Sequence, residues 1–185
     1  MMSPAGRHAL RFTLYHCHTT MTTATTDTAD TIENITYDEL AIGQSGQLQR
    51  TLTADDIRAF AAVSGDTNPA HLDAEYASHT LFHGVIAHGM WGASLISALL
   101  GTRFPGPGTI YLEQNLQFTK PVHIGDTLTV TATVLSKDDE HHRVELDCQV
   151  VNQKGAVVVH GNARVMAPTE KVRRARIAAP IIRLV

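Results

Sequence analysis

The strongest constraint on the fold of this chain is a strict alternation of apolar and polar residues in its second half. Four apolar side chains between residues 127 and 134 alternate with four threonines, and residues 143–150 repeat the pattern with charged and polar partners. Successive side chains of a strand point to opposite faces of a sheet, so a period of two predicts antiparallel strands with one wet face. Residues 110–118 and 157–165 carry two further sets, and a first strand is predicted around residues 48–52.

Two other segments have helical periodicity. A helix is predicted over about residues 54–63, with Thr53 as its N-cap and Gly65 as its stop. Residues 88–100 are apolar nearly all round, which predicts a helix enclosed by other structure and ended by Gly101. This is the only element apolar enough to cover the sheet. The predicted fold class is therefore α+β, a curved antiparallel sheet of about five strands wrapped around a long buried helix.

Composition excludes several classes of protein. A chain of 185 residues with 43% hydrophobic and 18% charged side chains suits one domain with a substantial core. A formal net charge of -3 with scattered basic residues argues against nucleic-acid and membrane partners. No run approaches the ~18 apolar residues of a spanning helix. Two distant cysteines, Cys17 and Cys148, do not form a disulfide scaffold, which predicts a reducing, cytoplasmic location.

The two ends of the chain differ in composition from the middle. Residues 1–34 are predicted to be a disordered, Thr-rich leader. Its apolar residues are too interrupted for a secretory signal, and Met21 is an alternative start to Met1. Residues 169–185 lose the alternation and are predicted to be a basic tail or linker. A single domain over residues 35–168 lies between them.

Residues 64–71 read Ser-Gly-Asp-Thr-Asn-Pro-Ala-His and contain an acid and an imidazole five positions apart. In a strand Asp66 and His71 would face opposite sides, and in a helix they would diverge by about 140°. Only a turn aims both at one point, and Gly65 and Pro69 favour a turn. Such a pair can deprotonate a water and return its proton to a neighbouring atom. Taken alone, these residues also fit a capped turn without catalytic function.

A second segment favours the catalytic interpretation. Gly89 opens the predicted buried helix, whose first N–H groups can stabilise an anion, and it lacks the Cβ that would block close approach. An oxyanion site that faces a water-activating pair suits a carbonyl compound.

Three segments together resemble a known family. Residues 64–71, residues 85–90 (Val-Ile-Ala-His-Gly-Met) and residues 107–112 (Pro-Gly-Thr-Ile-Tyr-Leu) are similar to the MaoC-like (R)-specific enoyl-CoA hydratases of the hot-dog fold. The similarity spans about residues 37–168. It implies reversible hydration of trans-2-enoyl-CoA to (R)-3-hydroxyacyl-CoA in fatty acid metabolism, by a homodimer that needs no cofactor beyond the coenzyme A of its substrate.

The resemblance also implies roles for single residues. Asp66 and His71 would be the catalytic pair, the Gly89 amide would donate to the thioester oxygen, and Ser97 matches a serine that supports the site. Residues 167–172 resemble a join that in some relatives leads into a phosphate acetyl/butyryl transferase domain.

Four residues are predicted to contact the substrate: Asn68, His88, Ser97 and Gln114. His88 either touches substrate or braces the start of the helix. Ser97 either assists the chemistry or bonds a carbonyl one turn back, and Gln114 either lines the acyl pocket or satisfies a bulge. The eleven histidines show no convincing spacing of ligands, so no metal is predicted.

Two alternative functions stay open. A hot-dog acyl-CoA thioesterase could use the same water-activating carboxylate and oxyanion amide, although the Asp66-to-His71 spacing matches the hydratases and not the thioesterases. A non-catalytic acyl-CoA-binding module is the second alternative, against which the intact acid and imidazole argue.

Overall fold

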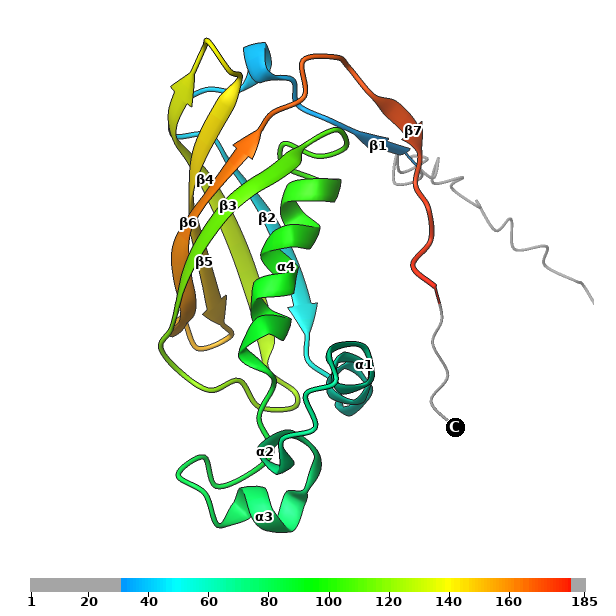
Figure 1. The fold of residues 1–185 in the computed structure, drawn as a ribbon, viewed down its shortest axis with the longest axis vertical. Helices are drawn as coiled ribbons and strands as arrows, with labels where there is room; N and C mark the ends of the chain where they lie inside the picture. Colours follow the sequence, from blue (N-terminus) through cyan, green and yellow to red (C-terminus); the bar gives the residue numbers. More distant parts are fainter. Residues whose placement is uncertain (1–30, 181–185) are drawn as a thin grey trace, which may run out of the picture.

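The computed structural model describes residues 31–180, and its centre is a five-stranded antiparallel sheet that curves around helix α4, Gly89–Thr102 (Figure 1). The strand order is β2-β4-β5-β6-β3. This confirms the predicted α+β architecture and hot-dog arrangement. The strands are β2 (Ser45–Thr51), β3 (Ile110–Phe118), β4 (Thr127–Asp138), β5 (Arg143–Asn152) and β6 (Val157–Met166).

Because of the alternation in the sequence, one face of each central strand is apolar and packs against α4. In β4 up to Val134 and in β5 up to Val150, every second residue is buried, while the residues between them are half-buried or exposed. On the helix side, Ile96 and Leu99 have no exposed surface. Full burial of each such side chain stabilises the fold by about 1.5–3 kcal/mol. The contact between sheet and helix is therefore the main source of stability.

Helix α1 (Ala54–Ser64) begins and ends where the sequence predicted. The Thr53 hydroxyl accepts the N–H of Asp56, and the Asp56 carboxylate accepts the N–H of Thr53. At the other end Gly65 adopts a left-handed φ of 76°, which only glycine takes up without strain. The chain can therefore leave the helix sharply just before Asp66.

The predicted end of α4 at Gly101 is wrong. The helix continues to Thr102, and the N–H groups of Arg103 and Phe104 both donate to the carbonyl of Leu99. An added Cβ at Gly101 would meet no neighbouring atom, so this glycine is a tolerated helical residue. At 14 residues α4 is the longest helix of residues 31–180, and no helix there is long and apolar enough to cross a membrane.

Several short elements were not predicted. Helices α2 (Pro69–Leu72) and α3 (Ala74–Ser78) lie between α1 and α4, and a single 3-10 turn covers Tyr37–Glu39. Strand β1 (Thr31–Glu33) pairs with β7 (Arg173–Ala175) in a ribbon that projects from the body (Figure 1).

The ribbon falls on segments that the sequence assigned to the leader and the tail. Residues 1–30 of that leader and 181–185 of that tail lie outside the described residues, and the domain bounds stay a prediction. Asn34, 1% exposed, fixes the base of the ribbon. Its side-chain amide donates to the carbonyls of Pro107 and Glu170, and its oxygen accepts the N–H of Val172.

Candidate active site

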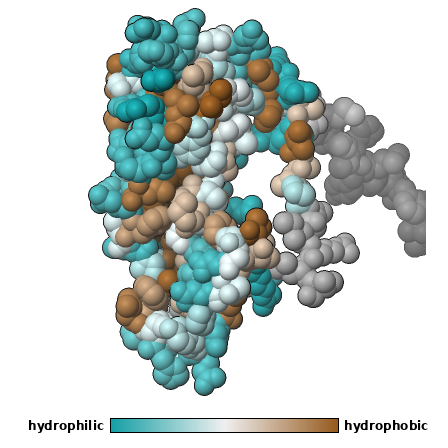
Figure 2. Space-filling view, viewed as in Figure 1, coloured by the Kyte–Doolittle hydropathy of each residue, from teal (hydrophilic) through white to brown (hydrophobic). Residues whose placement is uncertain are grey.

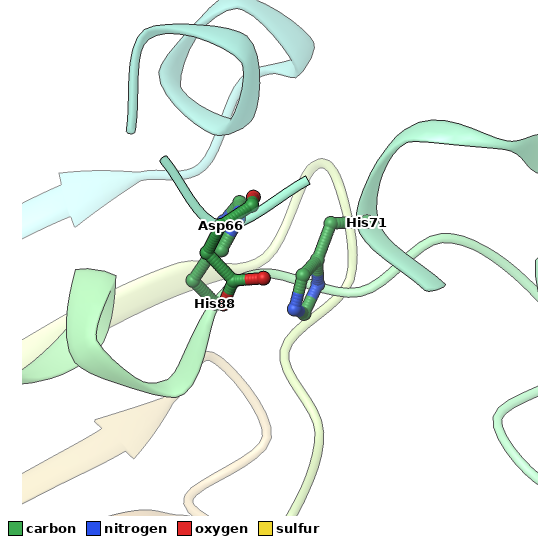
Figure 3. Close-up of side chains that lie close together, drawn as sticks. All are labelled: Asp66, His71 and His88. Atoms are coloured by element: carbon green, nitrogen blue, oxygen red, sulfur yellow. The ribbon is translucent and has the colours of Figure 1, made fainter. Parts of the chain in front are cut away.

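Three side chains converge between α1 and the start of α4. The carboxylate of Asp66 and ring nitrogens of His71 and His88 lie within 4.8 Å of one another, and Figure 3 shows the carboxylate pointing toward the ring of His71. The predicted convergence of Asp66 and His71 is therefore confirmed, while their catalytic role stays a prediction. The site lies at the end of the molecule where α1, α2 and α3 gather (Figure 1).

Local hydrogen bonds shape the turn that carries Asp66. The N–H of Asp66 donates to the Ser64 hydroxyl at 3.2 Å, and the Asp66 carboxylate accepts the N–H of Asn68 at 3.2 Å. Asn68 in turn caps α2, because its side-chain oxygen accepts the N–H of Ala70. The predicted contact between Asn68 and substrate stays a prediction, and its side-chain oxygen already has this structural partner.

His71 lies on α2 with its tautomer fixed by the backbone. Its Nδ1 is 2.9 Å from the carbonyl oxygen of Ile86. A carbonyl only accepts, so Nδ1 carries the proton and Nε2 of the neutral ring is free to take one. A water that hydrogen-bonds two groups at ordinary length and tetrahedral angle separates them by roughly 4.6 Å. The Asp66 carboxylate and a ring nitrogen of His71 lie within 4.8 Å of each other, a separation that one shared water can bridge.

His88 is buried beneath this pair, with 2% of its surface exposed. Its Nε2 is 2.9 Å from the backbone carbonyl oxygen of Asp66, so Nε2 is the donor. The ring lies 3.9 Å from the ring of His71, with 31° between the planes, and 5.0 Å from the ring of Phe60. Although His88 precedes the first turn of α4, its side chain makes no capping hydrogen bond to that helix.

The three groups were tested as a metal site. Two imidazoles bound to one tetrahedral zinc through bonds of about 2.0–2.1 Å would hold their ring centroids roughly 5 Å apart. The ring centroids of His71 and His88 are only 3.9 Å apart, with 31° between the ring planes, which is closer than one shared tetrahedral ion would hold them. The donor set does not fit a chelated ion in this geometry, and the prediction of no metal stays a prediction.

A cavity of about 280 Å³ opens beside the site and has mainly apolar walls. Gly89 lies in its lining at the first position of α4, where backbone N–H groups have no partner within the helix. A Cβ added to Gly89 would come within 3.1 Å of the Phe118 ring, which faces it from β3. A glycine at this position therefore avoids a tight contact with the Phe118 ring.

Ser97 and Gln114 line a different hollow, of about 410 Å³, that shares no residue with the first. The Gln114 amide donates to the carbonyls of Asn115 and Asn162, and its oxygen accepts the Tyr111 hydroxyl. The strand register shifts between Tyr111 and Glu113, but the Gln114 amide bonds carbonyls outside that stretch, so both alternatives for Gln114 stay open. Within the described residues the Ser97 hydroxyl makes no hydrogen bond, neither to a carbonyl one turn back nor to the site.

Sequence reasoning missed three contributors to the site: the Ile86 carbonyl, the Phe60 ring and the Phe118 ring. A backbone carbonyl carries no residue signal. The two phenylalanines fall inside the predicted elements at residues 54–63 and 110–118, and nothing in the spacing showed that α1 and β3 would bring them beside His88 and Gly89.

Comparison with known proteins adds independent information. Residues 39–156 match the MaoC-like domain family. An (R)-specific enoyl-CoA hydratase of Rhodospirillum rubrum is 48% identical over 134 residues, which are 71% of this chain and 91% of the relative. A 3-hydroxybutyryl-CoA dehydratase of Methylorubrum extorquens is 39% identical over 135 residues, 73% of this chain and 85% of the relative. The unliganded structure of an R-hydratase from Pseudomonas aeruginosa superposes with a TM-score of 0.80 at 47% identity, covering 84% of this chain and 99% of that one.

Proposed function

This chain belongs to the MaoC-like domain family, and from that membership we propose that it is an (R)-specific enoyl-CoA hydratase. The enzyme adds water reversibly to trans-2-enoyl-CoA and forms (R)-3-hydroxyacyl-CoA. The observation that carries this proposal is the convergence of Asp66 and His71 beside an apolar cavity that contains Gly89. Relatives at 48% and 39% identity that are named hydratase and dehydratase support both directions of the reaction.

The mechanism begins with one water held between the Asp66 carboxylate and Nε2 of His71. The pair removes a proton as the water oxygen forms a bond to the β carbon of the enoyl thioester. The electron pair of the double bond moves toward the thioester, whose oxygen becomes negative. The α carbon then takes a proton from the same pair, which lies on the same face of the substrate, so addition is syn.

Gly89 stabilises the charged state in this scheme. Its N–H, at the positive end of the α4 dipole, donates to the thioester oxygen more strongly when that oxygen is an enolate. Interactions that strengthen in the transition state raise kcat, and one such donor is worth about 3–4 kcal/mol in comparable oxyanion sites. The apolar walls beside it, which include Ile86, Val122 and Val159, suit an acyl chain.

Of the four residues predicted to contact substrate, Asn68 is nearest to the proposed catalytic pair, because it follows Asp66 in the same exposed turn. His88 borders the cavity beside Gly89, but it is 2% exposed and its Nε2 donates to the Asp66 carbonyl, so we assign it no substrate contact. Ser97 and Gln114 lie on the other hollow, so they reach the same acyl chain only if that chain passes between α4 and β3. If a substitution at Ser97 changes the preferred acyl chain length, the chain passes between α4 and β3. If the preference stays the same, Ser97 does not contact the acyl chain.

A homodimer accounts for the surface over α4 and β3. Figure 2 shows hydrophobic side chains gathered in the middle of this face. Strand β3 is an edge of the sheet, and an unpaired edge is usually covered by another strand or element. Met90, Ile110 and Leu112 are 57%, 54% and 43% exposed. We expect light scattering to give twice the mass of one chain, and Ile110→Lys to give a monomer.

Neither a cofactor nor a redox partner enters this reaction. Hydration adds the elements of water without net oxidation, so substrate and water balance the equation. We propose the cytoplasm as its location because the chain has only two cysteines, of which Cys148 is a buried free thiol.

The decisive experiment follows the loss of enoyl-thioester absorbance with crotonyl-CoA, and then the chirality of the product. We expect the (R)-3-hydroxy product, and we expect Asp66→Asn to lose about 10²-fold or more in rate. Asp55→Asn, a matched change at an exposed acid of α1, leaves the rate unchanged. Release of free coenzyme A from saturated acyl-CoA would favour the thioesterase, and tight binding without either reaction would favour the binding module.

A further inference from the structure

The turn that carries Asp66 (residues 65–68) is tied to the rest of the protein at one point. Its other hydrogen bonds are local and join residues no more than four positions apart. Within the described residues, the bond from His88 Nε2 to the Asp66 carbonyl is the only one that links this turn to a distant part of the chain. The residues of the turn are all exposed, so packing adds little to hold them.

The same imidazole supports the second member of the pair. The centroid of the His88 ring lies 5.0 Å from that of Phe60 on α1 and 3.9 Å from that of His71 on α2. The Ile86 carbonyl holds Nδ1 of His71 in place by a hydrogen bond. The ring plane of His71 can still tilt about this fixed nitrogen. A flat ring stacked at 3.9 Å restricts that tilt. One buried side chain therefore constrains the backbone of Asp66 and the ring plane of His71 together.

The second ring nitrogen of His88, Nδ1, has no hydrogen-bond partner among the described residues in this arrangement. With Nε2 as donor, Nδ1 is an acceptor, and it is buried without a hydrogen-bond partner within residues 31–180. An unpaired buried acceptor is unfavourable, because it has lost its hydrogen bond to water without gaining another. Such a cost persists at functional sites when it maintains a geometry that the chemistry requires.

We propose that His88 is a positioning residue, which aligns Asp66 through a hydrogen bond to its carbonyl and His71 through ring stacking, and does not itself touch the substrate. This inference rests on the proposed hydratase function for its kinetic consequences. In place of the expected contact with substrate, which would affect KM, His88 would affect kcat through the alignment of Asp66 and His71. A misplacement of about 1 Å in a catalytic pair can cost about 10²-fold in rate.

The experiment separates the two constraints with two substitutions at one position. His88→Phe keeps a flat ring in the stack but removes the donor, whereas His88→Gln places an amide N–H near the position of Nε2 but removes the ring. We expect His88→Phe to lower kcat by about 10²-fold with KM for crotonyl-CoA unchanged, and His88→Gln to recover a clear part of that loss. His79→Gln, at an exposed histidine bonded only within its own helix, is the matched control and leaves kcat unchanged.

A readout that does not need turnover accompanies the kinetics. Amide hydrogen exchange of Asn68 and His71, whose N–H groups donate to the Asp66 carboxylate and the Asn68 carbonyl, should be faster in His88→Phe than in the wild type, and close to wild type in His88→Gln. If the wild type fails to hydrate enoyl-CoA, the proposed function falls, yet the exchange data still decide whether His88 holds the turn. Wild-type kcat and exchange in His88→Phe would overturn the proposal. A rise in KM in both variants, with exchange unchanged, would overturn it in favour of substrate contact.

Discussion

The sheet with α4 and the segment between α1 and α4 are held together in opposite ways. The first is secured by many buried side chains, of which Val130, Leu146 and Leu99 have no exposed surface. The second is mostly exposed, and two hydrogen bonds from histidine rings fix the proposed catalytic pair. The body therefore carries the stability, and the proposed chemistry belongs to a lightly tied segment. Changes in the two regions should affect different measurements.

The largest effect should come from the segment. We expect His71→Gln to lower kcat by about 10²- to 10⁴-fold, because the amide cannot accept a proton from water. The melting temperature should change little, since His71 is only half-buried. A large drop in the melting temperature of His71→Gln, alongside the drop in kcat, would contradict the division between the body and the segment. Steady-state kinetics and thermal denaturation of the same preparation check both.

The complementary change lies in the body. Leu99→Ala removes a side chain with no exposed surface at the centre of α4. It should cost about 2–5 kcal/mol of unfolding free energy, because the lost burial adds to the cost of a cavity. Urea denaturation measures this loss. We expect kcat per folded molecule to stay near the wild-type value, and a collapse of kcat in the folded protein would show that the body also tunes the site.

The same contrast explains which parts of the structure could be predicted from sequence. The strands of the sheet and helices α1 and α4 follow from alternation and from the cap at Thr53, which are local patterns. The β1–β7 ribbon depends on Asn34, whose amide reaches residues more than 130 positions away. The helix end at Gly101 was misjudged because a glycine permits a stop without enforcing one.

The candidate site divides in the same way. The convergence of Asp66 and His71 was predictable because Gly65 and Pro69 leave the chain few ways to turn between them. The stack of His88 on His71 was not, because it requires α1 and the start of α4 to close on a segment with no periodicity of its own. For the same reason nothing in the sequence separated Ser97 from the Asp66 site.

A smaller effect on the body is expected from the cap of α1. Thr53→Ala removes the hydroxyl that accepts the N–H of Asp56 and should cost about 1 kcal/mol of unfolding free energy. Because α1 ends at Gly65, directly before the catalytic turn, this variant tests whether the boundary between the two regions is sharp. We expect kcat to change less than twofold, roughly the scale of a surface change far from the chemistry. A larger drop would mean that fraying of α1 reaches Asp66.

A further prediction is a loss of stability in alkaline solution, and it arises in the body. Burial, together with a 2.6 Å hydrogen bond to the Asp139 carboxylate, raises the pKa of Tyr37 to about 12. The folded protein therefore holds the phenol proton more tightly than the unfolded chain, whose tyrosines ionise near pH 10. The stability from Tyr37 is present below pH 10 and is lost as the pH rises toward 12.

Melting temperatures between pH 8 and 11 test this difference. Burial likewise raises the pKa of Tyr111 and of the Cys148 thiol to about 12, so these groups contribute to the slope with the same sign. Tyr37→Phe should flatten part of the decline, whereas Tyr76→Phe, at a half-exposed tyrosine of α3, should leave it unchanged. An identical slope in wild type and Tyr37→Phe would contradict the assignment. Because none of these three groups lies between α1 and α4, alkaline unfolding should begin in the body, and the catalytic segment should follow it.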